Sequence, residues 1–191
     1  MKFLFGIIFL CSSLFSFSQV SNFKIYTLEE ALLVSPDSVY SIDLSRKKLY
    51  ELPKDLFRFR ELKLLNLSKN KLSLLSDSFA VFSHLETLTI SSNKFESLPA
   101  VLFKLGTLRY LFAAKNEITS IQNEIQYMQA LEEIDLYDNP ISSIGTGLQQ
   151  LKMLKKLDLQ GIMYGPTFHN YISQSLPNVM VKMDPPCNCM E

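Results

Sequence analysis

The side chains that most often carry out catalysis are few in this chain and do not form a recognisable set. The two histidines, His84 and His169, lie far apart, and neither falls in a metal-ligand pattern such as H-E-x-x-H. The sequence contains neither a nucleophile elbow nor a phosphate-binding loop. Asp43, Asp135 and Asp158 recur in one column, but a row of carboxylates alone is not an acid–base pair. We therefore expect no enzymatic activity, no cofactor and no metal.

The two cysteines near the C-terminus offer little further chemistry. Cys187 and Cys189 have no histidine nearby, and two thiols alone are too few for a structural zinc site. A disulfide across one intervening residue would be strained, because the Cα atoms and side-chain directions fit poorly. Pairing with another chain and two free thiols are the alternatives that remain open.

The aromatic residues offer a different chemistry, which is binding. Tyr110 and Phe112 would point to the same side of a strand, and Tyr137 would lie diagonally beside them on the next strand. The charged residues expected around them are Arg109, Glu132, Glu133, Asp135, Asp138 and Lys156. An exposed aromatic group with a charged rim is typical of a binding hot spot. The alternative is ordinary cross-strand packing of aromatic residues that favour sheets.

A period of 23 residues positions these side chains. An aliphatic residue recurs at this spacing, and further apolar columns follow three and five residues later. The first column comprises Val39, Leu62, Leu85, Leu108, Leu131 and Leu154. In the pattern L-x-x-L-x-L the fourth and sixth positions alternate as in a strand, so both point inward. Stacked units would form a parallel sheet that exposes the residues between them.

A polar column follows each expected strand. Its members are Asn70, Asn93, Asn116 and Asn139, whereas Lys47 and Ile162 occupy the position in the first and last units. An asparagine at this point can bond backbone groups that the sheet no longer pairs, in its own turn and the next. We expect these four residues to form a structural ladder.

These columns resemble the leucine-rich-repeat family in its 23-residue form, L-x-x-L-x-L-x-x-N-x-L-x-x-L-P-x-x-L-x-x-L-x-x, from residue 39 to about 162. The resemblance is to small exported bacterial members. It implies an α/β solenoid, a horseshoe with a parallel sheet on the concave face and short helical, 3-10 or loop segments on the convex face. It also implies protein–protein binding, as in most members, without naming the partner.

The chain divides into a signal peptide, two caps and the repeats. Thr27-Leu28-Glu29-Glu30 is a capping box that would open a short helix through about Leu33. A helix is expected over 167–175 and a closing strand over 178–183. The expected boundaries are 1–18 for the signal, 19–38 for the N-terminal cap, 39–61, 62–84, 85–107, 108–130, 131–153 and partial 154–162 for the repeats, and 163–191 for the C-terminal cap.

The N-terminus has the pattern of a secretory signal. Lys2 precedes an apolar stretch from Phe3 to Leu10, and Ser16 and Ser18 supply small residues for cleavage before Gln19. The stretch is too short for a membrane span, which needs roughly 20 residues. We expect a secreted or periplasmic protein without a stable span after cleavage. An uncleaved anchor and lipidation at Cys11 are the alternatives.

The formal net charge is +0, and no run of lysine or arginine suggests binding to nucleic acid. The sequence predicts a non-catalytic, exported module that binds a protein or peptide on its concave face. One alternative is carbohydrate or surface-glycan adhesion, in which the same aromatic rings would stack on sugars. Another is a regulatory subunit of an exported complex.

Overall fold

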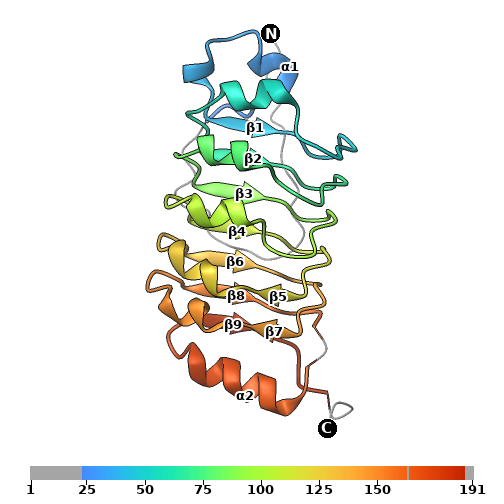
Figure 1. The fold of residues 1–191 in the computed structure, drawn as a ribbon, viewed down its shortest axis with the longest axis vertical. Coiled ribbons are helices and arrows are strands. Elements are labelled where there is room, and N and C mark those ends of the chain that lie inside the picture. Colours follow the sequence, from blue (N-terminus) through green and yellow to red (C-terminus); the bar gives the residue numbers. More distant parts are fainter. Residues whose placement is uncertain (1–22, 163, 188–191) are drawn as a thin grey trace, which may run out of the picture.

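The computed structural model describes residues 23–162 and 164–187, which form one stack of short coils (Figure 1). The expected signal peptide lies outside the described residues. Each coil contributes one strand to a parallel sheet, and the chain returns along the opposite side of the stack.

The sheet has seven parallel strands in the order β1-β2-β3-β4-β6-β8-β9. The register pairs equivalent positions of neighbouring repeats, such as Ser41 with Leu64 and Leu64 with Thr87. The strands are β1 (Ser41–Asp43), β2 (Leu64–Asn66), β3 (Thr87–Thr89), β4 (Tyr110–Phe112), β6 (Glu133–Asp135), β8 (Lys156–Asp158) and β9 (Met180–Lys182). Side chains that are a whole repeat apart in sequence are therefore direct neighbours on the sheet.

Short 3-10 helices occupy the opposite, convex side. They are η1 (Pro36–Ser38), η2 (Lys54–Arg58), η3 (Asp77–Val81), η4 (Ala100–Lys104), η5 (Asn123–Tyr127) and η6 (Thr146–Gln150). The predicted solenoid, with a parallel sheet on one side and short 3-10 segments on the other, is confirmed.

A second, two-stranded sheet was not expected from the sequence. It pairs β5 (Ser120–Ile121) with β7 (Ser143–Ile144). The amide of Gly145 donates to the Ile121 carbonyl at 2.8 Å. Two earlier repeats have Pro53 and Pro99 at the equivalent position, and proline has no amide hydrogen to donate. Loss of the proline therefore permits this extra pairing.

The inward columns form one continuous apolar core. Leu65, Leu88 and Leu111 of successive strands are fully buried. Burial of each such side chain contributes about 1.5–3 kcal/mol. On the convex side Phe79 and Phe82 meet edge to face, with ring centroids 5.1 Å apart. A single coil buries too little to be stable alone, so each unit depends on its neighbours.

The asparagine column bonds adjacent repeats together. The Nδ2 of Asn93 donates to the carbonyls of Ile90, in its own turn, and Leu67, in the preceding repeat, both at 2.9 Å. Its Oδ1 accepts from the Leu72 amide, also in the preceding repeat, at 3.0 Å. Asn70, Asn116 and Asn139 make the corresponding bonds. The bonds thus run to the preceding repeat, not to the next one as expected.

This direction accounts for the residues that replace asparagine at the two ends. Lys47 has no earlier repeat to bond, so its side chain need not be an amide. At the other end Ile162 offers no acceptor, and the amide of Ile141 donates instead to the Asn139 carbonyl at 2.8 Å. The sequence exceptions therefore follow from the position of each unit in the stack.

The N-terminal cap contains the predicted capping box. Helix α1 (Leu28–Ala31) begins after Thr27, whose hydroxyl accepts from the Glu30 amide at 3.2 Å while the Glu30 carboxylate accepts from the Thr27 amide at 3.0 Å. The helix ends at Ala31, earlier than expected. Pro36 follows soon after and favours an extended or turn conformation in the residue before it.

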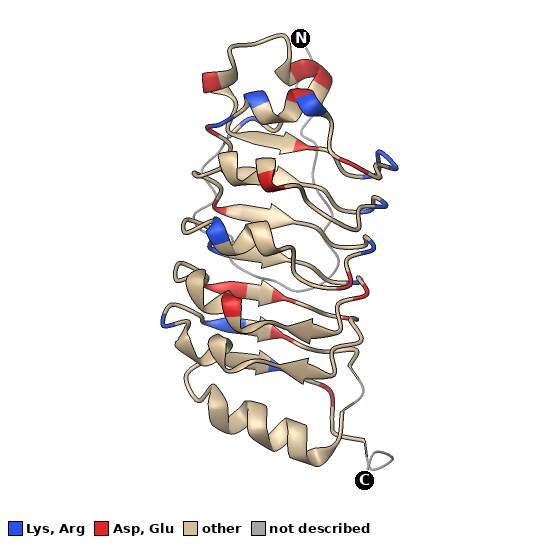
Figure 2. Cartoon of the chain, viewed as in Figure 1, with Lys and Arg blue, Asp and Glu red and all other residues tan. Residues whose placement is uncertain are grey.

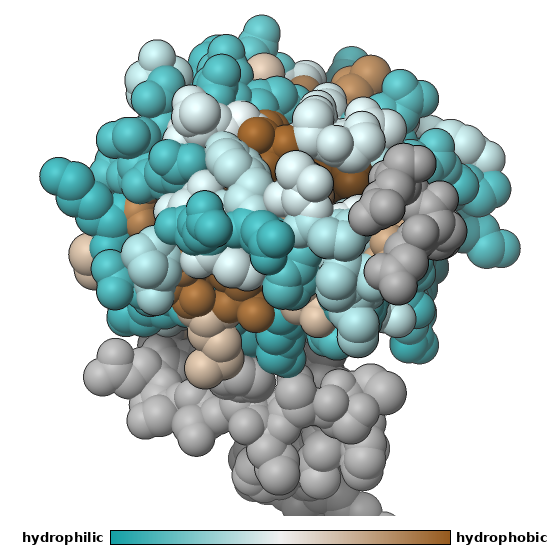
Figure 3. All heavy atoms as spheres, turned by 90° about the horizontal axis from the view of Figure 1, so that it is seen from below, coloured by the Kyte–Doolittle hydropathy of each residue, from teal (hydrophilic) through white to brown (hydrophobic). Residues whose placement is uncertain are grey.

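The C-terminal cap contains helix α2 (Pro166–Ser175) and strand β9, which joins the main sheet beside β8. The hydroxyl of Tyr164 donates to the Asp184 carbonyl and fixes the tail against the last repeat. Cys187 is disulfide-bonded, so the alternative of two free thiols is wrong. Seen from this end, most of the visible surface is hydrophilic (Figure 3). The cap therefore presents a mainly polar surface at the end of the stack.

The ladder predicts a specific loss of stability. Asn93→Ala leaves the buried Leu72 amide without its side-chain acceptor. It also removes one hydrogen bond to the Leu67 carbonyl and one to the Ile90 carbonyl, which still accept from Asn70 and Asn116 respectively. We expect a lower free energy of unfolding by about 2–3 kcal/mol, measured in urea. The control is Lys47→Ala in the same column, whose exposed side chain should contribute less than about 0.5 kcal/mol. Equal effects of the two changes would contradict the proposed role.

Candidate binding face

The structure brings several of the predicted binding residues together on the concave face. Tyr110 and Phe112 flank the buried Leu111 in β4, and both are half-buried. The register places Glu133 beside Tyr110, and Asp135 beside Phe112. Two outward columns thus continue from the aromatic strand onto the charged strands.

A shallow pocket of about 270 Å³ lies across β4, β6, β8 and β9. Its lining residues are Tyr110, Glu132, Glu133, Lys155, Lys156 and Met180. Met180 is 61% exposed and comes from the closing strand, so it lies outside the repeat pattern that identified the others. Sequence reasoning missed it because its pairing with Lys156 depends on the C-terminal cap.

The two charges at the base of this pocket neutralise each other. Lys156 Nζ lies 2.5 Å from Glu133 Oε1, and both side chains are largely shielded from water. The pair therefore leaves no net charge in this part of the pocket.

Asp135 lies on the concave face and also accepts a backbone hydrogen bond at the end of its strand. Its Oδ1 accepts from the Tyr137 amide at 3.0 Å, as Asp43, Asn66 and Asp158 do for the amides two residues after them. Burial raises the pKa of Asp135, the hydrogen bond from Tyr137 opposes this, and the nearby charge of Asp158 raises the pKa further. This column of acidic and amide side chains therefore pairs a backbone amide just beyond the end of each of these strands.

Tyr137 lies apart from the other two aromatic residues. Among the described residues, no ring-to-ring contact joins it to Tyr110 or Phe112. Tyr137 is 41% exposed, and Lys115 Nζ lies 5.8 Å from its ring centroid. Tyr110 has its own cation, with the Arg109 guanidinium 5.2 Å from the ring centroid. Within the described residues, the three predicted aromatic rings thus make no ring-to-ring contact with one another, and Tyr110 and Tyr137 each lie beside a different cation.

A ladder of alternating charges borders the pocket, and it was missed as a unit. Its members, each one repeat apart, are Lys63, Glu86, Arg109, Glu132 and Lys155. The nitrogen–oxygen distances along it are 3.5, 3.9, 2.5 and 2.7 Å. The alternation of sign at a period of 23 residues was a readable signal in the sequence.

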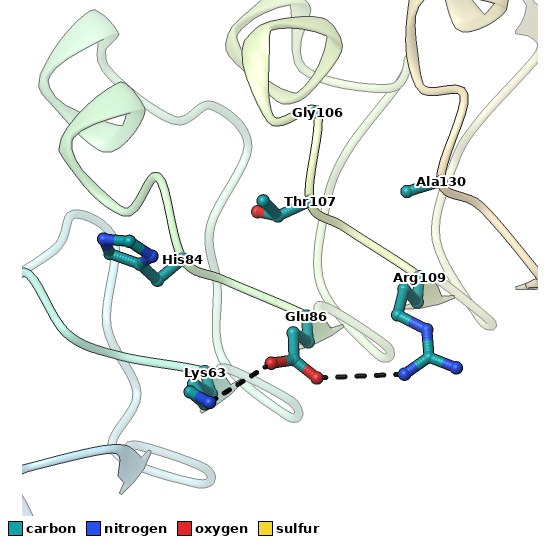
Figure 4. Close-up of a pocket in the computed structure, with 7 residues that line it drawn as sticks. All are labelled: Lys63, His84, Glu86, Gly106, Thr107, Arg109 and Ala130. Carbon is teal, nitrogen blue, oxygen red and sulfur yellow. Dashed lines mark ion pairs between the residues drawn. The ribbon is translucent and has the colours of Figure 1, made fainter.

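The first three members of this ladder, Lys63, Glu86 and Arg109, border a second, more open pocket of about 470 Å³ (Figure 4). Glu86 lies between Lys63 and Arg109 and pairs with both. His84 also lines this pocket, whereas His169 lies in α2 with its ring centroid 6.0 Å from that of Tyr164. The two histidines therefore belong to different parts of the stack.

Glu132 is the most buried member of the ladder. Its carboxylate accepts from Lys155 at 2.7 Å and from Arg109 Nε at 2.6 Å. The hydrogen bond from Lys155 lowers the pKa of Glu132, burial opposes this, and the hydrogen bond from Arg109 lowers it again. A carboxylate whose pKa is lowered on folding stabilises the folded state above its unfolded pKa, and this contribution is lost in acid.

Neutralising this carboxylate should therefore have a pH-dependent effect. Glu132→Gln should lower the free energy of unfolding at pH 7 by about 1–2 kcal/mol, a modest value because Arg109 and Lys155 keep access to water. The difference from the parent protein should shrink as the pH falls below about 5 and the carboxyl is protonated in both states. Urea unfolding at several pH values measures it. Glu117→Gln, in an exposed pair with Lys94, is the control and should have almost no effect.

The part of the chain that the structure describes contains no cluster of three or more metal-ligating side chains. Within residues 23–162 and 164–187, none of the helices has the length and apolar character needed to cross a membrane.

Solved structures with the same architecture come from several bacterial proteins. A leucine-rich-repeat protein of Leptospira interrogans is 25% identical, with a TM-score of 0.59, over 77% of this chain and 43% of its own. An internalin of Listeria monocytogenes is 22% identical, with a TM-score of 0.62, over 78% and 44%. Internalin C2 of the same species is 19% identical, with a TM-score of 0.64, over 77% and 62%. The chain thus spans between 43% and 62% of the length of these proteins.

No curated protein matches the sequence. The model of the leucine-rich repeat region family matches residues 41–184, which include all seven strands of the main sheet. The chain therefore belongs to the leucine-rich-repeat family.

Proposed function

We propose that this protein binds a protein or peptide partner on the concave face, in the pocket that Tyr110, Met180 and their charged neighbours line. Leucine-rich-repeat proteins are generally protein-interaction modules, which supports binding as the role. The single observation that carries the location is this pocket beside an aromatic strand. We propose further that the chain acts by binding alone, without catalysis.

The composition of the pocket suits an extended or irregular peptide. The Tyr110 ring, which has Arg109 beside it, provides a large apolar contact at low entropic cost. Met180 is flexible and adapts to different apolar side chains. The Glu133 and Lys156 charges neutralise each other, so this pair adds no net charge to the pocket. An apolar centre surrounded by paired charges is the arrangement of binding hot spots.

The first strands of the sheet lack such a centre. At the positions equivalent to Tyr110 and Phe112, β1 has Ser41 and Asp43, β2 has Leu64 and Asn66, and β3 has Thr87 and Thr89. None of these strands has an aromatic residue there. The outward face is therefore asymmetric, and we assign recognition to its C-terminal half.

We also propose that the protein acts outside the cytoplasm, after removal of a signal peptide. The supporting features are Lys2, the apolar stretch Phe3–Leu10 and the small residues Ser16 and Ser18. N-terminal sequencing of the protein from its native host should begin at Gln19. Recovery of the intact N-terminus, or a lipid on Cys11, would contradict this expectation.

The binding proposal can be tested with a random peptide library. Peptides enriched on the full chain should bind Tyr110→Ala/Phe112→Ala at least about tenfold more weakly, because the variant removes the aromatic contacts. The matched control is Thr87→Ala/Thr89→Ala, the same two columns one strand earlier, which should bind as the parent protein does. Isothermal calorimetry measures the affinities, and urea unfolding shows whether each variant is folded.

Two outcomes would reject the proposed site. Enriched peptides that bind the Tyr110 and Phe112 variant unchanged would place recognition elsewhere. Failure to enrich any peptide, together with binding of a neutral glycan that the same variant abolishes, would favour the alternative of sugar stacking on these rings.

A further inference from the structure

Lysine and arginine side chains from four successive repeats gather on one edge of the solenoid. We name this surface the basic edge. It comprises Arg46, Lys47, Lys48, Lys69, Lys71, Lys94 and Lys115. All seven are exposed, and they lie on the loop tips that follow the first strands (Figure 2). Arg46, Lys47 and Lys48 are adjacent in the sequence, and the stack brings the lysines of the next three repeats beside them.

The backbone of each turn holds these residues in rows. Arg46, Lys69, Ser92 and Lys115 share one column and have positive φ angles of 60°, 58°, 58° and 56°, in the left-handed region. The amides of Lys71 and Lys94 each donate to a carbonyl of the preceding repeat at 2.8 Å. Because each turn repeats the last, the Cα atoms of a row follow the strand spacing of roughly 4.8 Å.

Most of this charge is not neutralised by the protein itself. Within the described residues, the ion pairs of the basic edge are Lys47–Glu29 at 3.7 Å and Lys94–Glu117 at 2.7 Å. The other five cations form no ion pair with a described residue. Like charges in adjacent rows repel each other, so the arrangement disfavours the free protein and favours an anionic ligand.

The edge has a clear end. The column of Arg46, Lys69 and Lys115 has Ser92 in the third repeat and ends at Asp138. The neighbouring column of Lys48, Lys71 and Lys94 ends at Glu117. The cationic surface is therefore a narrow strip along the axis of the first four repeats, and a linear ligand would fit it best.

An exposed aromatic ring lies within this strip. Tyr50 is 68% exposed, and Lys71 Nζ donates to its hydroxyl at 2.8 Å and lies 4.9 Å from its ring centroid. This contact orients the ring while leaving most of it accessible. A flat apolar ring beside cations suits a ligand whose units have both an apolar face and a negative charge.

We propose that the basic edge binds a linear acidic polysaccharide that carries one carboxylate on each sugar. The cations of successive turns suit a chain that carries a negative charge on each of its units. The sugar rings also offer an apolar face for Tyr50, which a polyglutamate chain lacks. This surface is separate from the concave pocket.

The test measures binding of the full chain to immobilised polygalacturonate, with neutral dextran as the reference polymer. We expect salt-sensitive binding to polygalacturonate and none to dextran. Lys48→Gln/Lys69→Gln/Lys71→Gln should weaken binding by about tenfold or more and reduce the slope against log salt by roughly two to three. The matched control, Lys54→Gln/Lys104→Gln/Lys152→Gln, removes three exposed cations away from the edge and should bind as the parent protein does.

Other results would overturn the proposal. An equal loss in both triple variants would show that overall charge, not the basic edge, attracts the polymer. Equal or tighter binding to polyglutamate or to oligothymidylate would replace the polysaccharide with an acidic peptide or a nucleic acid strand. Tyr110→Ala/Phe112→Ala should bind polygalacturonate unchanged, which separates this surface from the concave pocket.

Discussion

The hydrogen bonds of the asparagine column are the interaction on which the rest of the structure depends. Each amide joins its own turn to the repeat before it, and neighbouring amides share the same carbonyls, as Asn70 and Asn93 share that of Leu67. The chain therefore leaves the strands of successive repeats at the same point, with a left-handed residue at the equivalent position from Arg46 to Gly161. This fixed exit makes every later position of one repeat meet its counterpart in the next.

Equivalent side chains of successive repeats therefore form rows along the stack. Whether a row stabilises the fold depends on the signs of its charges. Before the strands, the signs alternate from Lys63 to Lys155, so each charge has partners and the row stabilises the stack. After the strands, the same geometry places cations beside cations. In the first row the side chains neutralise one another. On the basic edge most cations have no ion-pair partner among the described residues, and we propose that a ligand neutralises them. This difference distinguishes a structural row from a binding surface.

The concave face combines both kinds of behaviour. Glu133 and Lys156 neutralise each other. Asp135 and Asp158 each accept a hydrogen bond from the backbone amide two residues later, at the end of their own strand. What remains available to a partner is chiefly apolar, namely Tyr110 in β4 and Met180 in β9. The polar groups of the pocket are thus already paired with each other, and its free contact surface comes from Tyr110 and Met180.

The sequence by itself determined the repeat, the inward columns, the asparagine positions and the capping box at Thr27, because each rests on local or periodic patterns. It also placed Tyr110, Glu133 and Lys156 on one face. The lysines at positions 48, 71 and 94 also follow the period of 23 residues. Tertiary structure alone decided that Met180 lines the pocket and that Lys115 lies beside the Tyr137 ring. These outcomes depend on the register of a cap outside the repeat and on competition among side chains for partners, neither of which a one-dimensional pattern contains.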